Sequence, residues 1–309
     1  MSRVTCRSVC LLAPAKVNLF LEVLGKRLDG FHDIETFMVA IDLCDRLEFE
    51  RDDSGIIAIA SDDPAVPIGP ENLIWRAAES LRRLTGCRWG VRVRLTKRIP
   101  MQAGLAGGST DAAATLKGLN RLWDLGCTTE DLTRLGAELG SDVPFFFAPG
   151  AAWCTGRGDI VEPWRLPRPI HLVVVCPGFG LSTPTVFRHV RVPESPKSSR
   201  EMRRALEAGD IEMMGRSLYN RLQESAETLA PSIRHWLDRL RGESPAGCLM
   251  SGSGSAVVAL CRDRNEAMRV ARSLRADVAD RRTSEQEASR PPAQEAGSYA
   301  QIHVVRSCP

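Results

Sequence analysis

Apolar and polar residues alternate from Ala15 to Val23, and this period of two predicts a half-buried β-strand. Alternate side chains of a strand share a face, so the pattern places Lys16, Asn18 and Glu22 together on the polar side. The same reading extends the predicted sheet further along the chain. Its additional strands are predicted over residues 34–41, 46–50, 56–60 and 91–97.

Apolar residues at helical spacing predict three helices in the first half of the chain. Asn72 precedes the first helix and is a suitable N-cap, and Gly140 follows the third and is a suitable residue to end it. A hairpin or buried turn is expected over residues 145–154. The predicted helices cover residues 73–84, 109–123 and 129–139.

Three prolines between Pro163 and Pro169 interrupt regular structure, and we place a domain boundary there. The predicted domains are residues 1–165 and residues 166–309. In the second domain, residues 280–298 are polar and charged and predict a flexible insertion. The strands predicted there cover 170–176, 247–250, 256–261 and 299–305, and the helices cover 183–190, 199–208, 210–225, 231–241 and 264–276.

The composition is that of an ordinary globular protein. Of the 309 residues, 43% are hydrophobic and 26% charged, which excludes disordered, collagen-like and coiled-coil classes. The net charge of +3 is compatible with an anionic small substrate and does not require nucleic acid. The ten cysteines form no C-x-x-C pair, and no apolar stretch approaches the roughly 20 residues of a membrane helix. We therefore expect a cytoplasmic protein with free thiols and no membrane contact.

The clearest candidate for chemistry is the Gly-rich segment between a predicted strand and an Ala-rich helix. Glycine lets the backbone approach a ligand closely, and a helix N-terminus attracts phosphate. We therefore expect a phosphate-binding loop; the alternative is a tight turn followed by an ordinary Ser or Thr N-cap. No Lys follows the glycines, so the segment is not a Walker A motif, and it lacks the G-x-G-x-x-G spacing as well. The predicted loop residues are Pro100, Met101, Gln102, Ala103, Gly104, Leu105, Ala106, Gly107, Gly108, Ser109 and Thr110.

Two shorter segments carry weaker signals. Lys16 and Asn18 share a strand face, and His32 follows a turn; these side chains could hold an anionic ligand or could be ordinary solvated residues. Asp142 lies just past a predicted helix end in apolar surroundings. It could serve catalysis or could bond its own backbone in a turn, and spacing does not decide between the two.

Together these segments resemble the three motifs of the GHMP kinase superfamily, small-molecule kinases that include galactokinase, homoserine kinase and mevalonate kinase. The resemblance covers most of residues 11–262. The string Asp29-Gly30-Phe31-His32 resembles the sequences of those GHMP kinases that act on a CDP-linked methylerythritol more than the sequences of other members of the superfamily. The motif matches are residues 14–18, 100–110 and 251–255, and the further similar strings are 24–32, 71–74 and 139–144.

The resemblance implies a two-domain α+β architecture and a role for particular residues. The N-terminal domain would resemble domain 2 of ribosomal protein S5, and the C-terminal domain would be ferredoxin-like. Asp142 would be the catalytic Asp and Lys16 its partner. Phe31, where the family usually has Tyr, would stack on cytosine together with Phe187, and His32 would read the edge of the base. By the same resemblance, Asn18 would belong to the substrate site, and Asn72 and Lys97 would lie beside the adenine of ATP.

The implied reaction is ATP-dependent phosphorylation of the 2-hydroxyl of the CDP-linked methylerythritol, in non-mevalonate isoprenoid synthesis. Mg²⁺ is expected with ATP, and spacing identifies no ligands for it. The alternatives are a GHMP kinase for another alcohol, a nucleic-acid-binding module and a member that binds nucleotide without catalysis. The small net charge argues against the second, and the presence of Lys16 and Asp142 against the third. We expect a monomer or homodimer. Ala106 replaces a common Gly and is expected to adopt a backbone angle compatible with an L-residue.

Overall fold

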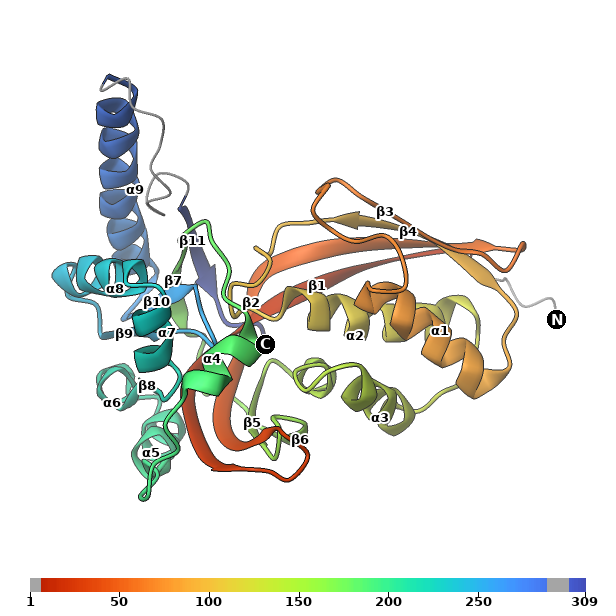
Figure 1. Ribbon diagram of the computed structural model, residues 1–309, viewed down its shortest axis with the longest axis horizontal. Coiled ribbons are helices and arrows are strands. Elements are labelled where there is room, and N and C mark those ends of the chain that lie inside the picture. Colours follow the sequence, from red (N-terminus) through yellow and green to blue (C-terminus); the bar gives the residue numbers. More distant parts are fainter. Residues whose placement is uncertain (1–6, 288–299) are drawn as a thin grey trace.

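The computed structural model describes residues 7–287 and 300–309, and it has the α+β organisation predicted from the sequence. Two β-sheets lie next to each other; helices cover one face of the first sheet and pack on both faces of the second (Figure 1). Within the described ranges, no helix combines the length and apolar character needed to cross a membrane.

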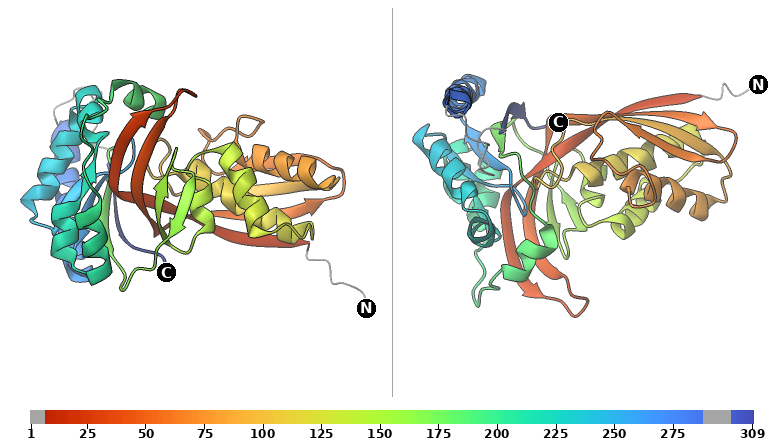
Figure 2. Two further views of the ribbon diagram at one scale, coloured as in Figure 1. Left: turned by 90° about the horizontal axis from the view of Figure 1, so that it is seen from below. Right: turned by 45° about the horizontal axis from the view of Figure 1, so that its top comes forward.

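The first sheet is built around a long antiparallel ribbon of β1 and β2. This ribbon starts near the N-terminus, bends where it passes the second sheet and ends in a hairpin tip that projects beyond that sheet, where His32 packs against Phe187 (Figure 2). The order is β3-β4-β2-β1-β8; in addition, β5 pairs with β2, and β6 pairs with β5. The two strands predicted over 34–41 and 46–50 are one continuous strand. The bounds are β1 Ser8–Lys26, β2 His32–Asp52, β3 Ile57–Ser61, β4 Gly90–Thr96, β5 Ala151–Thr155, β6 Ile160–Pro163 and β8 Tyr219–Asn220.

An irregularity in β1 changes which side chains share a face. The register shifts between Asn18 and Phe20, and a shift of one residue turns all following side chains to the opposite side. Leu21 therefore lines the same cavity as Asn18, whereas Glu22 is fully buried on the other side. The prediction that Glu22 shares the face of Lys16 is wrong, because period-two counting cannot detect a bulge.

Three helices cover one face of the first sheet and enclose the core of the N-terminal half (Figure 1). Asn72 caps the first helix as predicted, since its Oδ1 accepts a hydrogen bond of 2.8 Å from the N–H of Ile74. The region 145–154, expected to be a hairpin or buried turn, holds most of a short buried 3₁₀ helix and then β5, which forms a hairpin with β6. The bounds are α1 Leu73–Thr85, α2 Gly107–Leu122, α3 Thr129–Leu139 and the 3₁₀ helix η1 Pro144–Phe147.

The second sheet has the order β11-β7-β10-β9, and its neighbouring strands are antiparallel. Numbered along the chain, this is the order 4-1-3-2 of a ferredoxin-like sheet, as predicted. The strand bounds are β7 His171–Cys176, β9 Gly247–Met250, β10 Val257–Cys261 and β11 Gln301–Arg306. The helix bounds are α4 Thr183–His189, α5 Arg200–Ala208, α6 Ile211–Ser217, α7 Gln223–Leu229, α8 Ser232–Gly242 and α9 Arg264–Glu287.

Two predicted helices of this half differ from the structure. The single helix expected over 210–225 is wrong: α6 ends at Ser217, and Tyr219 then pairs with Phe20 of β1 before α7 begins. Long-range strand pairing thus overrides local helical spacing. The helix expected over 264–276 continues to Glu287. The rest of the predicted flexible insertion, 288–298, lies outside the described residues.

The two halves of the chain are joined by a shared core as well as by β8. Val17 and Phe37 of the ribbon pack in the same apolar cluster as Leu172 and Leu249 of the second sheet. The chain passes from the first sheet to the second between Pro163 and His171. The domain boundary at 165/166 therefore stays a prediction, whereas the junction of the halves is a continuous packed region.

Candidate active site

A cavity of about 1120 Å³ opens between the two halves. Small-molecule pockets are typically about 300–1,000 Å³, so this cavity has room for more than one ligand. Its walls come from β1, β2, the Gly-rich loop, the turn after α3, and α4. The predicted site residues that line it are Lys16, Asn18, Phe31, His32, Lys97, Pro100, Met101, Gln102, Ala103, Gly104, Ala106, Gly107, Gly108, Ser109, Asp142 and Phe187.

The Gly-rich loop connects β4 to α2 and is held against a second turn, residues 251–255. The carbonyl of Ala103 accepts a hydrogen bond of 3.1 Å from the N–H of Ala256, and Oγ of Ser251 donates one of 3.1 Å to the carbonyl of Gly104. A Cβ on Gly104 would lie 2.1 Å from the carbonyl oxygen of Ser251, and its φ is +75°. Glycine is therefore required at this position both by the close approach and by the backbone conformation.

The start of α2 is open to a ligand. Ala106 is the N-cap and makes no side-chain cap hydrogen bond, so the first backbone N–H groups of the helix lack that partner. Gly107, Gly108 and Ser109 all line the cavity at this end. The alternative of a Ser or Thr N-cap is wrong, since the helix begins before Ser109. Unpaired N–H groups at the positive end of a helix form a site suited to phosphate.

Ala106 adopts a left-handed conformation, with φ of 57° and ψ of 34°. This angle is compatible with an L-residue, as expected, but lies in a small and seldom used region. This conformation costs an L-residue roughly 1–2 kcal/mol because Cβ approaches the following carbonyl oxygen. The loop geometry thus imposes on Ala106 a shape better suited to glycine.

The charged groups of Lys16 and Asp142 lie close together in the lining of the cavity. Nζ of Lys16 lies 3.8 Å from Oδ2 of Asp142, and it donates hydrogen bonds to Oδ1 of Asn18 (2.6 Å) and to the carbonyl of Gly104 (3.0 Å). The Lys16 side chain is 4% exposed and that of Asp142 is 36% exposed. Asn18 is itself fixed, because its Nδ2 donates to Oγ1 of Thr36 at 2.8 Å. An immobilised ammonium and a partly open carboxylate therefore face one space beside the phosphate loop.

Lys97 is also next to the loop but has different neighbours. Its Nζ contacts a carboxylate oxygen of Asp45 and lies 3.2 Å from Oδ2 of Asp111, and all three side chains are buried. Burial raises the pKa of Asp111 to about 7, and the Lys97 charge only partly offsets this. A Cβ on Gly107 would lie 2.8 Å from Nζ of Lys97. The lysine thus lies under the loop, bound to two carboxylates.

Aromatic and basic side chains line the other end of the cavity, at the tip of the β1–β2 hairpin. The rings of His32 and Phe187 have centroids 5.2 Å apart with planes inclined by 31°. Phe31 is 48% exposed, and the guanidinium of Arg157 lies 4.9 Å from its ring centroid. Burial, with a smaller contribution from the charge of Lys26, lowers the pKa of His32 below its usual 6.5. At neutral pH the imidazole is therefore uncharged and can both donate and accept hydrogen bonds.

Three predicted loop or nucleotide residues do not line the cavity. Leu105 and Thr110 are buried in the protein interior. Both polar groups of the Asn72 side chain are engaged, because Oδ1 caps α1 and Nδ2 donates to the carbonyl of Pro67 at 2.6 Å. Its neighbour Leu73 reaches the cavity instead.

Arg157 is a cavity residue that sequence reasoning missed. It lies in a turn between Gly156 and Gly158, whose φ angles are 66° and 99°. A Gly-Arg-Gly string between two strands was the available signal, since such a turn projects its central side chain outward. The cationic lining residues outnumber the anionic ones, which suits ligands that carry phosphate. The cations are Lys16, Lys26, Lys97, Arg157 and Arg188, and the anions are Asp29 and Asp142.

Comparison with known families agrees with this geometry. Residues 72–150 match the family described as GHMP kinases N terminal domain, and residues 202–280 match GHMP kinases C terminal. The chain belongs to the GHMP kinase family, which confirms the resemblance drawn from its three motifs.

Similar proteins narrow the comparison to one kind of GHMP kinase. A Shouchella clausii (strain KSM-K16) protein named 4-diphosphocytidyl-2-C-methyl-D-erythritol kinase is 40% identical over 264 residues, 85% of this chain and 89% of that protein. One of the same name from Pelotomaculum thermopropionicum (strain DSM 13744 / JCM 10971 / SI) is 42% identical over 269 residues, covering 86% of this chain and 94% of that protein.

Solved structures give the same result. A crystal structure of 4-(cytidine 5'-diphospho)-2C-methyl-D-erythritol kinase has a TM-score of 0.76 at 35% identity and covers 97% of this chain and 99% of its own. A homoserine kinase from Cytophaga hutchinsonii has a TM-score of 0.74 at 16% identity and covers 99% of this chain and 96% of its own. At this identity, the similarity shows the fold alone.

Proposed function

We propose that this chain is an ATP-dependent kinase that phosphorylates the 2-hydroxyl of 4-diphosphocytidyl-2-C-methyl-D-erythritol, a step of non-mevalonate isoprenoid precursor synthesis. The observation that carries the proposal is the position of the Lys16–Asp142 pair. Both residues line one cavity with the phosphate loop and with His32 and Phe187. The relatives that bear this enzyme name support the choice of substrate.

In this proposal the loop and the start of α2 bind the triphosphate of ATP. Phosphoryl transfer depends mainly on positioning and on charge stabilisation. Lys16, held by Asn18 and Gly104, offsets the charge that accumulates between the two phosphate-bearing ligands. Asp142 orients the substrate hydroxyl and accepts its proton as the phosphoryl group is transferred.

Magnesium is proposed to accompany ATP. No group of three or more His, Cys, Asp or Glu residues in the described ranges could hold a metal ion. Mg²⁺ in kinases is bound largely by substrate phosphates and water, with one or two protein oxygens, and the Ser109 hydroxyl, which lines the cavity at the start of α2, would be one such oxygen. The ion would supply charge neutralisation of the phosphate oxygens.

The aromatic end of the cavity is proposed to bind the cytidine of the substrate. Phe31 and Phe187 would stack on the base, and the uncharged His32 would hydrogen-bond to its edge. Protonation removes the acceptor of His32. We therefore expect KM for the substrate to stay constant from pH 9 to 6.5 and to rise only below that usual histidine pKa.

A substrate panel tests the proposal against the alternative of another GHMP kinase. The purified chain is incubated with ATP and Mg²⁺ plus the CDP-linked methylerythritol, homoserine, mevalonate or galactose, and ADP release is measured. Release with the CDP-linked alcohol alone supports the proposal. Release with another alcohol and none with the CDP-linked one would overturn it.

His32→Ala sharpens the test of the cytidine end. Losing the hydrogen bond to the base should raise KM for the CDP-linked substrate about tenfold or more, and leave KM for ATP unchanged. His303→Ala is a matched control, because His303 lies on β11 and bonds Gln301 instead of lining the cavity. Equal losses for both substrates would contradict the assignment of His32.

A further inference from the structure

The turn of residues 251–255 forms one wall of the cavity and is immediately next to the ammonium of Lys16. A methyl group on Gly252 would lie 3.1 Å from Nζ of Lys16 and 3.3 Å from Oδ1 of Asn18. Ser251 connects the same turn to β1, since its Oγ accepts a hydrogen bond of 3.3 Å from the N–H of Asn18. The turn thus packs close to the Lys16 ammonium and is bonded to Asn18, one of the two groups that accept a hydrogen bond from it.

This turn is held from behind by one buried side chain, Asn220 of β8. Nδ2 of Asn220 donates hydrogen bonds of 2.7 Å to the carbonyls of Met250 and Gly252, which uses both of its hydrogens. Its Oδ1 accepts a bond of 2.9 Å from the N–H of Leu222 at the start of α7. Both donors and the carbonyl oxygen of the amide group are therefore engaged, and they join β8 to the start of α7, to the end of β9 and to the turn.

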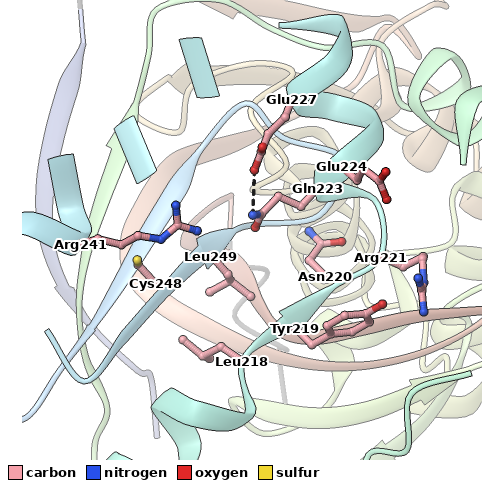
Figure 3. A pocket seen from close by; sticks show the side chains of 10 residues that line it. All are labelled: Leu218, Tyr219, Asn220, Arg221, Gln223, Glu224, Glu227, Arg241, Cys248 and Leu249. Atoms are coloured by element: carbon pink, nitrogen blue, oxygen red, sulfur yellow. Dashed lines mark hydrogen bonds between the residues drawn. The ribbon is translucent and has the colours of Figure 1, made fainter. Parts of the chain in front are cut away.

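Asn220 reaches the turn from outside the active-site cavity. It lines a separate cavity of about 340 Å³, next to Gln223 and with Cys248 and Leu249 of β9 in the same lining (Figure 3). Gln223 assists from the same wall, because its Oε1 accepts a bond of 3.0 Å from the N–H of Met250. The pairing of Asn220 with Leu21 places β8 beside the strand that carries Lys16. Asn220 is 7% exposed and does not line the larger cavity.

We propose that Asn220 is a positioning residue for phosphoryl transfer, acting through Gly252 to hold the Lys16 ammonium in place. It is not a catalytic residue, because the contacts of its side chain are to backbone groups behind the site. The inference rests on the proposed kinase function for its kinetic readout. Misplacement of a catalytic group by about 1 Å can reduce the rate about 10²-fold, so a change in this distant amide is expected to affect turnover.

The test compares Asn220→Ala and the isosteric Asn220→Asp with wild type. The first removes both donors, and the second places a carboxylate against two carbonyl oxygens. We expect kcat to fall about 10- to 100-fold, with binding of CDP, measured by calorimetry, unchanged within about twofold. Asn120→Ala is the matched control, since the Asn120 amide also bonds backbone groups, the carbonyl and the N–H of Cys127, but lines neither of the two cavities. It should keep wild-type turnover.

Hydrogen exchange of residues 250–256 provides a second readout that does not depend on activity. Both Asn220 variants should accelerate exchange there and leave β7 protected, whereas Asn120→Ala should not affect the turn. Turnover within threefold of wild type in Asn220→Ala, or unchanged exchange of the turn, would overturn the inference. If Asn220→Asp does not fold, Asn220→Ala decides. A wild-type protein that transfers no phosphate to the CDP-linked alcohol would refute the proposed function, and the exchange result would still decide the role of Asn220.

Discussion

Lys16 and Lys97 are both nearly buried beside the phosphate loop, but they face different partners. Nζ of Lys97 contacts Asp45 and Asp111, whose side chains are 0% and 5% exposed. Nζ of Lys16 has Asp142 at 3.8 Å, and 36% of that side chain is accessible. Around Lys97, two carboxylates face one ammonium, and all three side chains are almost completely buried. Around Lys16, one opposite pair faces a cavity that can receive phosphate.

The difference separates a structural lysine from a candidate catalytic one. Because the charge of Lys97 is more than balanced, it has little attraction left for an anionic ligand, although it lines the cavity. Lys16 keeps an open side, and its other donors are fixed by Asn18 and Gly104. Proximity to the phosphate loop is thus insufficient to identify the functional lysine, and the partners decide.

Replacing each of the two lysines by methionine tests this comparison most strongly. Lys97→Met leaves two buried carboxylates without a cation and should destabilise the fold by about 3–5 kcal/mol. Urea unfolding measures the change. Lys117→Met is a control of similar burial, since Lys117 donates to the carbonyl of Phe146 and its loss should cost only about 1 kcal/mol. Equal destabilisation by Lys97→Met and Lys117→Met would contradict the structural role assigned to Lys97.

Lys16→Met should have the opposite profile. Removing one preorganised cation that stabilises developing charge typically lowers kcat about 10²–10³-fold. The stability should fall by about 1–2 kcal/mol, less than in Lys97→Met, because two hydrogen bonds are lost but Asp142 remains partly solvated. Single-turnover phosphoryl transfer and urea unfolding on the same sample separate the two effects. A stable variant with near-normal turnover would show that the comparison assigns the wrong lysine.

Asp111→Asn sharpens the account of the Lys97 cluster through its pH dependence. Burial raises the pKa of Asp111 from 3.8 to about 7, so the folded state holds a proton that the unfolded state has lost. Stability from this group is therefore present below about pH 4 and is lost as pH rises to about 7 and above. The Oδ1 atom of Asp111 is buried without a hydrogen-bond partner, and an unsatisfied buried group costs roughly 1–3 kcal/mol.

The expected result is a free energy of unfolding that declines less between pH 4 and 8 in Asp111→Asn than in wild type. The variant should be the more stable protein at pH 8. Unfolding curves at four pH values across this window measure the difference. Parallel pH profiles for the two proteins would mean that Asp111 is not the group that titrates.

The smallest effect concerns the loop that both lysines adjoin. Ala106→Gly should stabilise the protein by about 0.5–1 kcal/mol, because relief of the left-handed conformation exceeds the added entropy of the unfolded chain. Ala113→Gly in the middle of α2 should destabilise by a similar amount. Thermal unfolding measures both effects: the melting temperature should rise in Ala106→Gly and fall in Ala113→Gly. A loss of stability in Ala106→Gly would mean that the loop does not strain this residue.

Hydrophobic periodicity predicted most elements of the fold because they form where the local pattern and tertiary packing agree. α1 is an example, with Asn72 as its cap and a buried stripe against the first sheet. Prediction failed where a distant contact overrides the local pattern. Tyr219 pairs with Phe20, which interrupts the expected helix, and the bulge after Asn18 reverses the face of Glu22.

The site was predictable in its motifs but not in its pairings. Lys16 and Asp142 could be named because each lies in a short recognisable string. The partners of Lys97 could not be predicted, since these carboxylates lie 52 and 14 positions away in the chain and no local pattern reveals them, and its place on the adenine side stays a prediction. Asn220 had no visible signal because its role depends on backbone carbonyls brought to it by folding.

The most direct test of the central claim is a double-mutant cycle of Lys16→Met and Asp142→Asn, measured by single-turnover phosphoryl transfer to the CDP-linked alcohol. If the two side chains act as a unit, each single change should lower the rate about 10²–10⁴-fold with ATP binding retained. The double variant should then be no more than about threefold slower than the slower single one. Losses that multiply, or near-wild-type transfer by Asp142→Asn, would contradict the account.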